Sequence, residues 1–106
     1  MKKLYSFNQS EGKLIDKIIN DDILMINHII LNKGEFLPEH CSNSNVYMVV
    51  VQDTITLQLG NKSEEEHING TIVNIPNNIK MNVSNKSDGQ LEFFVLKVLN
   101  PKLYQD

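Results

Sequence analysis

Short apolar runs alternate with turn signals along this chain, and this pattern restricts the fold more than any other feature. The turn signals combine Asn, Asp, Gly and Pro, and they fall at 20–22, 32–34, 52–53, 60–62, 69–70, 76–78 and 87–89. The runs between them are rich in β-branched residues, at 14–19, 23–31, 46–51, 54–59, 71–75, 81–83 and 91–98. Such spacing predicts an all-β sandwich or barrel, with a helical turn within 9–19 as the one alternative.

Two local patterns make this prediction specific. Residues 54–59 read Thr-Ile-Thr-Leu-Gln-Leu, so strict alternation predicts one buried face and one wet face. Asn69 and Gly70 form a dipeptide that is typical of a type I′ hairpin turn, in which both central residues need a positive φ.

A length of 106 residues predicts one domain, residues 1–106. We divide it into an N-terminal strand segment (1–22), a barrel core (23–99) and a tail (100–106). The longest apolar run, 46–51, is far too short to span a membrane, and the first ten residues lack a signal-peptide core. We therefore expect a cytoplasmic protein.

Charge and cysteine content exclude several classes of partner. Arginine is absent, the ten lysines are scattered and the net charge is −3, so we expect no nucleic-acid partner. The single cysteine, Cys41, excludes an internal disulfide and a cysteine-built zinc site. We expect Cys41 to be a buried or half-buried structural thiol, because free cysteine often packs like a small apolar residue.

A first motif lies around residue 40. Gly34 is followed, after five residues, by His40. This spacing resembles the first sequence motif of the cupin superfamily, which has glycine, a His-x-His pair, glutamate and a closing glycine. In the resemblance, the second histidine position is Ser42, the glutamate position is Val46 and the closing glycine position is Asp53.

A second motif follows at the spacing of the second cupin motif. Gly70 is followed by five residues and then Pro76. The second glycine position is Asn78, the histidine position is Met81 and the final asparagine is Asn85. The resemblance covers about half of the chain without gaps, and it implies a double-stranded β-helix, or jelly-roll barrel.

The metal ligands implied by the resemblance are mostly replaced. Of the four ligand positions only His40 is retained, and the others are Ser42, Val46 and Met81. Catalytic zinc usually has three protein ligands, and iron oxygenases of this type need two histidines and a carboxylate. We therefore expect no metal and no other cofactor.

Strand alternation together with the resemblance predicts a largely apolar pocket inside the barrel. We expect either Phe93 or Phe94 to face inward, and we select Phe94. The expected pocket residues are His40, Ser42, Val46, Met48, Met81, Val83 and Phe94. No catalytic residue is assigned, and His40 is the only candidate. For His28 we expect a satisfied core or surface histidine, and for His67 a position on a solvated strand edge.

These features leave three functions open. The first is metal-independent binding of an unknown small molecule without obvious catalysis. The second is a small-molecule enzyme with His40 in its pocket, either epimerase- or isomerase-like or a metal-dependent dioxygenase. The third is a dimeric interaction protein, because the resemblance implies a homodimer and both faces of the last strand, 91–98, are largely apolar.

Overall fold

The computed structural model describes residues 1–99, which form strands and no helix. The strands are β1 (Leu14–Asn20), β2 (Leu24–Leu31), β3 (His40–Cys41), β4 (Asn45–Gln52), β5 (Thr54–Leu59), β6 (Glu65–Ile68), β7 (Ile72–Ile75), β8 (Lys80–Ser84) and β9 (Leu91–Val98). The predicted all-β fold is therefore confirmed. Among the same residues there is no helix long and apolar enough to cross a membrane. The proposed tail, 100–106, lies outside the described residues.

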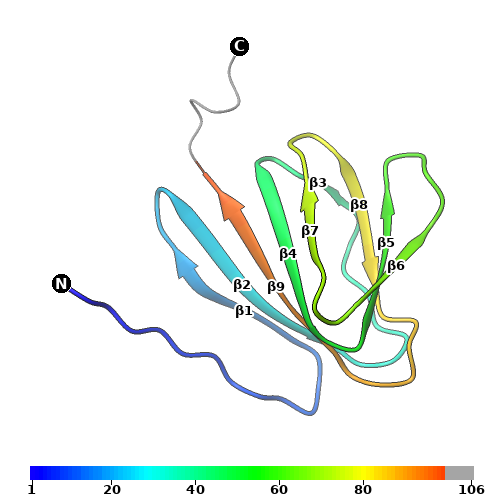
Figure 1. The fold of residues 1–106 in the computed structure, drawn as a ribbon, viewed down its shortest axis with the longest axis horizontal. Coiled ribbons are helices and arrows are strands. Elements are labelled where there is room, and N and C mark those ends of the chain that lie inside the picture. The colour runs from blue at the N-terminus through cyan, green and yellow to red at the C-terminus, as the bar shows by residue number, and fades with distance from the viewer. Residues whose placement is uncertain (100–106) are drawn as a thin grey trace.

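The strands form two antiparallel sheets (Figure 1). The larger sheet has the order β1-β2-β9-β4-β7 and the smaller one the order β3-β8-β5-β6. Successive strands β7, β8 and β9 lie alternately in the larger, the smaller and the larger sheet, and β4 and β5 are divided in the same way. This winding produces the jelly-roll architecture that the sequence predicts. Residues 1–10 run as an extended stretch outside the sheets before they reach β1.

Apolar side chains from the facing sides of the two sheets form the core. The buried apolar residues of this cluster are Ile29, Leu31, Val46, Met48, Val50, Ile55, Leu57, Ile75, Met81, Val83, Leu91, Phe93 and Val95. On β5, Ile55 and Leu57 are buried as the alternation predicts. Thr56 on the wet face is nevertheless only 3% exposed, because its short side chain lies between Glu66 of β6 and Ser84 of β8.

The four glycine positions of the two motifs share one backbone conformation. Gly34 has a φ of 83° and Gly70 a φ of 90°. Asp53 and Asn78, which replace glycine in the motifs, have φ values of 65° and 68°. Asp and Asn tolerate this left-handed region better than other side chains. The motif spacing therefore preserves the turns even where the glycine itself is lost.

The turn at Asn69 and Gly70 differs from the predicted hairpin. Ile68 O accepts a hydrogen bond from Thr71 N at 3.2 Å, and of the two central residues only Gly70 has a positive φ. These features describe a type II turn, so the prediction of type I′ was wrong. The physical reason is topological, because the turn joins β6 of one sheet to β7 of the other instead of two paired strands.

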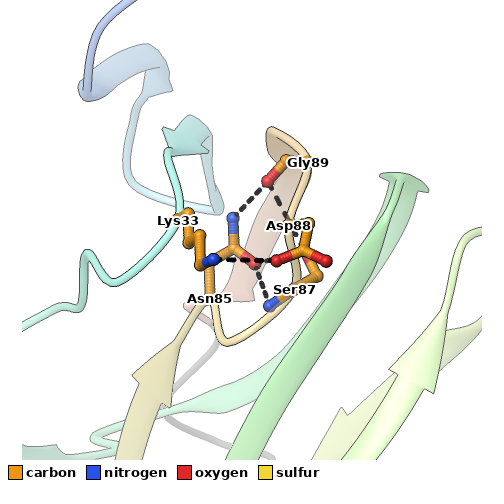
Figure 2. Close-up of polar contacts among 5 residues, drawn as sticks. All are labelled: Lys33, Asn85, Ser87, Asp88 and Gly89. Atoms are coloured by element: carbon orange, nitrogen blue, oxygen red, sulfur yellow. Dashed lines mark hydrogen bonds and ion pairs between the residues drawn. The ribbon is translucent and has the colours of Figure 1, made fainter.

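Asn85, the last residue of the second motif, holds the loop between β8 and β9 (Figure 2). Its buried Nδ2 donates to Leu31 O and to Gly89 O, each at 2.8 Å. Its Oδ1 accepts from Ser87 N at 2.9 Å and from Ser87 Oγ at 2.5 Å. An exposed ion pair joins Asp88 of this loop to Lys33, with Lys33 Nζ 2.9 Å from Asp88 Oδ1 (Figure 2). Asn85 thus has a structural role, since its side chain is saturated by backbone and loop partners.

Candidate functional site

A cavity of about 300 Å³ lies between the two sheets. Its apolar wall consists of Ile15, Ile29, Leu37, Met48, Met81 and Val95, together with Pro38. Three polar side chains complete the lining: Asn27 of β2, His40 of β3 and Lys97 of β9. The cavity therefore has an apolar body and a few polar groups, which is the usual composition of a small-molecule site.

Strand register explains why these side chains meet. Asn27 of β2 pairs with Val95 of β9, and Val95 pairs in turn with Met48 of β4. Directly paired residues project from the same face of a sheet, so Asn27 points into the barrel together with Val95 and Met48. Lys97 lies two residues beyond Val95 on β9 and therefore shares that face. Asn27 and Lys97 are thus diagonal neighbours at one end of the cavity.

His40 lies at the mouth of the cavity, on the opposite sheet. It is exposed and pairs with Met81 of β8. Its Nδ1 lies 3.1 Å from Pro38 O. A carbonyl oxygen only accepts hydrogen bonds, so Nδ1 carries the hydrogen in this contact. Nε2 is then the ring atom that is left to contact a ligand.

Three of the residues predicted for the pocket line the cavity, namely His40, Met48 and Met81. Ser42 lies close by in sequence but is only 4% exposed and is fully engaged. Its Oγ donates to Pro76 O at 2.7 Å and accepts from Ile79 N at 2.9 Å. Val46 and Val83 are buried in the core and are not among the cavity-lining residues.

Phe94 lies on the opposite face of β9. Its ring packs against Phe7 and His28, with centroid distances of 4.9 Å and 4.8 Å. Phe93, which is fully buried, is the aromatic residue of this pair that faces the core. The sequence could not separate the two because β9 carries apolar side chains on both faces.

Cys41 and two residues of the cavity lining differ from what the sequence predicts. Cys41 is exposed, because it follows His40 on the short edge strand β3 and points the other way. Asn27 and Lys97 are absent from the predicted pocket, although each is the polar residue on an otherwise apolar inward face of its strand. A polar residue on the apolar face of a strand is the sequence feature that could have identified both as cavity residues.

The residues at the motif's ligand positions do not fit a divalent metal. Ser42 is buried, and its Oγ is held by the two backbone contacts described above, one donated and one accepted. Val46 has no donor atom, and Met81 offers only a thioether, which is a poor ligand for Zn²⁺ or Fe²⁺. Within residues 1–99, no group of three or more His, Cys, Asp or Glu side chains is arranged to hold a metal ion.

A histidine and a glutamate form a buried pair on the outer face of the larger sheet. His28 is fully buried, and its Nε2 lies 2.6 Å from Glu92 Oε2. The ring of Phe7 covers His28 at a centroid distance of 4.9 Å. His28 thus pairs with a carboxylate through Nε2, whereas its buried Nδ1 has no hydrogen-bond partner among residues 1–99. The ring lies outside the barrel cavity. His67 lies on β6, the edge strand of the smaller sheet, as expected.

Comparisons with known proteins agree with this architecture. No family model matches the chain. The uncharacterized protein MJ0764 from Methanocaldococcus jannaschii is 37% identical over 103 residues, which cover 96% of this chain and 89% of the relative. Its crystal structure, described as an RmlC-like cupin with a double-stranded β-helix fold, superposes with a TM-score of 0.91 at 36% identity, covering 98% of this chain and 96% of that one.

More distant structures share the fold alone. A cupin superfamily protein from Desulfitobacterium hafniense has a TM-score of 0.76 at 10% identity and covers 90% of this chain and 84% of its own. The Cnp3 cupin domain of Schizosaccharomyces pombe has a TM-score of 0.78 at 11% identity, with 92% and 72% covered. The retained motif spacing, the two-sheet barrel and the close relative together show that this chain belongs to the cupin superfamily, with the double-stranded β-helix fold.

Proposed function

We propose that this cupin is a metal-independent protein that binds a small molecule in the barrel cavity. The main support for this proposal is the cavity itself, which has an apolar wall and three polar side chains from three different strands. A volume of about 300 Å³ lies at the lower end of the range for ligand sites, which favours a compact metabolite. The exposed free thiol of Cys41 supports a reducing compartment such as the cytoplasm.

Binding without turnover is favoured over catalysis because His40 lacks a carboxylate to orient it. The neighbouring Glu39 points elsewhere, since its Oε2 accepts a hydrogen bond from Asn82 Nδ2 at 2.9 Å. General acid–base chemistry requires positioned groups around the substrate, and His40 is held only by the Pro38 carbonyl. Turnover of a bound compound that disappears in His40→Ala would favour the enzyme alternative.

A thermal-shift screen tests the binding proposal. The library contains sugars, carboxylic acids and aromatic metabolites, and the protein is pre-treated with EDTA. A compound that binds only the folded state raises the unfolding midpoint by mass action. A broad library without a hit would contradict the proposal.

A matched pair of variants shows whether a compound found in the screen binds in the cavity. Ile15 and Ile72 lie on the two edge strands of the larger sheet and are 53% and 64% exposed. Ile15 lines the cavity, whereas Ile72 pairs with Val49 on the outer face. We expect Ile15→Trp to weaken binding by filling the cavity mouth and Ile72→Trp to leave it unchanged. Equal effects of both variants would place the ligand elsewhere.

The outer face of the larger sheet supports a second proposal, a homodimer. A register row across this face contains Ile72, Val49, Phe94 and His28. Exposed Val51 and Phe7 extend it, at 43% and 49% exposure. A two-fold axis would bury the same apolar patch on both copies. Light scattering at micromolar concentration should give a dimer that Ile72→Lys dissociates, and a monomeric wild type would contradict pairing.

A further inference from the structure

The polar groups of the cavity indicate what kind of molecule it takes. We infer that the barrel binds a small monocarboxylic acid with an apolar body and a hydrogen-bond donor beside its carboxylate. Lys97 receives the carboxylate and Asn27 receives the donor. This inference rests on the proposed binding function and names the ligand class for the same cavity.

Lys97 provides the positive charge. It is the one ammonium in the lining, which contains no carboxylate. Its side chain is half-buried, and no carboxylate among residues 1–99 lies within ion-pair distance of its Nζ. Lys17 of β1 pairs directly with Asn27 and so adds a second positive charge at the same end of the sheet. A partly desolvated cation without a counter-charge favours an anionic ligand.

Asn27 provides an acceptor. Its Oδ1 is buried and has no hydrogen-bond partner in the part of the chain that the structure describes. A buried acceptor without a partner costs free energy, so such groups are normally satisfied. Asn27 lines the cavity and is a diagonal neighbour of Lys97, so a donor on the atom next to the ligand's carboxylate would meet this requirement once the amide oxygen turns towards the cavity. A hydroxyl group is the simplest donor of this kind.

The remaining wall defines the body of the ligand. Met48, Met81 and Ile29 are at most 3% exposed and line the cavity beneath the polar groups. Methionine adapts its flexible thioether to the shape of an apolar partner. An unbranched alkyl chain or an aromatic ring therefore fits this wall, whereas a sugar leaves its hydroxyl groups unpaired against it.

Three probes test the inference by titration calorimetry on EDTA-treated protein. 2-Hydroxyhexanoate carries the charge and the donor, hexanoate only the charge, and methyl hexanoate neither. We expect affinity to fall in this order, by about tenfold for loss of the charge, because a charge-assisted contact is typically worth that factor. Equal affinity for hexanoate and its methyl ester would overturn the inference.

Variants assign each contact to its residue. Lys97→Met should remove the preference for hexanoate over the ester, and Asn27→Leu should remove the preference for the hydroxyl group. Lys62→Met, in the exposed loop between β5 and β6, changes the net charge equally and should leave both preferences intact. If Lys62→Met matches Lys97→Met, the effect is general electrostatics and the inference fails.

The outcomes separate this inference from the proposed function. Hits in the library screen that are neutral or cationic, with no binding of the three acid-series probes, would overturn the inference and leave the binding function standing. A screen in which nothing binds at all would overturn both.

Discussion

His28 Nε2 lies 2.6 Å from Glu92 Oε2 on the outer face of the larger sheet, where the two residues come from neighbouring strands β2 and β9. The imidazole is fully buried, and the Glu92 side chain is 9% exposed. Rings of Phe7 and Phe94 pack on His28 at 4.9 Å and 4.8 Å. This pair therefore forms the polar centre of a largely apolar surface, on which Asp16 of β1 lies directly opposite His28.

Removing one partner of the His28–Glu92 pair should lower the stability of the fold. We expect Glu92→Ala to lower the free energy of unfolding by about 3 kcal/mol, because it leaves His28 buried without its acceptor. Glu92→Gln retains an acceptor oxygen and should cost less. Urea denaturation measures both, with Glu64→Ala as control, since Glu64 forms a pair with Lys86 that is about half exposed and contributes little. Equal losses for Glu92→Ala and Glu64→Ala would contradict this view.

We expect substitution of Asn85 to destabilise the fold more than substitution of any other polar residue of the second motif. Asn85→Ala removes two donated and two accepted hydrogen bonds from a fully buried side chain, so we expect a loss of about 3 kcal/mol. Ser87→Ala is the matched control, since Asn85 Oδ1 keeps its bond from Ser87 N. That variant should lose about 1 kcal/mol. Denaturant midpoints that fall equally in both variants would show that the loop is not organised by Asn85.

The left-handed turns give a conformational prediction. Asp53 has a φ of 65°, so Asp53→Gly should be tolerated and Asp53→Ala should cost about 1–2 kcal/mol. Gly34→Ala isolates this effect, because a Cβ added at Gly34 meets no atom within 4 Å and the φ there is 83°. A thermal midpoint unchanged in Gly34→Ala would refute the conformational explanation.

A close approach between Gly89 and Asp53 predicts coupling between two loops. A Cβ at Gly89 would overlap the carboxylate of Asp53. We expect Gly89→Ala to cost about 1–3 kcal/mol in the wild type and much less in the Asp53→Gly background. A double-mutant cycle measures this coupling, and additive effects would argue against the contact.

Asp21 should stabilise the folded state by a small amount that depends on pH. Backbone hydrogen bonds from Leu24 N and Ile23 N hold the pKa of the Asp21 carboxyl below its ordinary value of 3.8. A lowered pKa in the folded state stabilises the fold above the unfolded pKa, and this stabilisation disappears as the pH falls through the folded pKa. The stability difference between wild type and Asp21→Asn should therefore shrink on acidification below about pH 4. Asp22→Asn serves as control, and a pH-independent difference would contradict the assignment.

The fold could be predicted because its signals are local. Turn residues at short intervals and the spacing of Gly34, Gly70 and Pro76 identify the barrel without knowledge of strand pairing. The same spacing places Asp53 and Asn78 in left-handed turns although neither is glycine. The type of turn at Asn69–Gly70 could not be read in this way, because it depends on which sheet each flanking strand joins.

The site was only partly predictable, for a different reason. His40, Met48 and Met81 follow from motif position and strand alternation. Asn27 and Lys97 reach the cavity only through the pairing of β2 with β9, which joins distant parts of the sequence. Phe94 was placed inside because β9 is apolar on both faces, so alternation alone cannot fix its orientation.

Binding of a ligand in the cavity without a metal is the central claim, and a titration of three forms of the protein tests it most directly. The best hit of the screen is titrated into wild type, Ile15→Trp and Ile72→Trp, each purified untagged and treated with EDTA. We predict undiminished binding to wild type and Ile72→Trp after EDTA treatment, and weakened binding to Ile15→Trp. Binding that disappears with EDTA and returns with Zn²⁺ or Fe²⁺, or that ignores Ile15→Trp, would contradict the account.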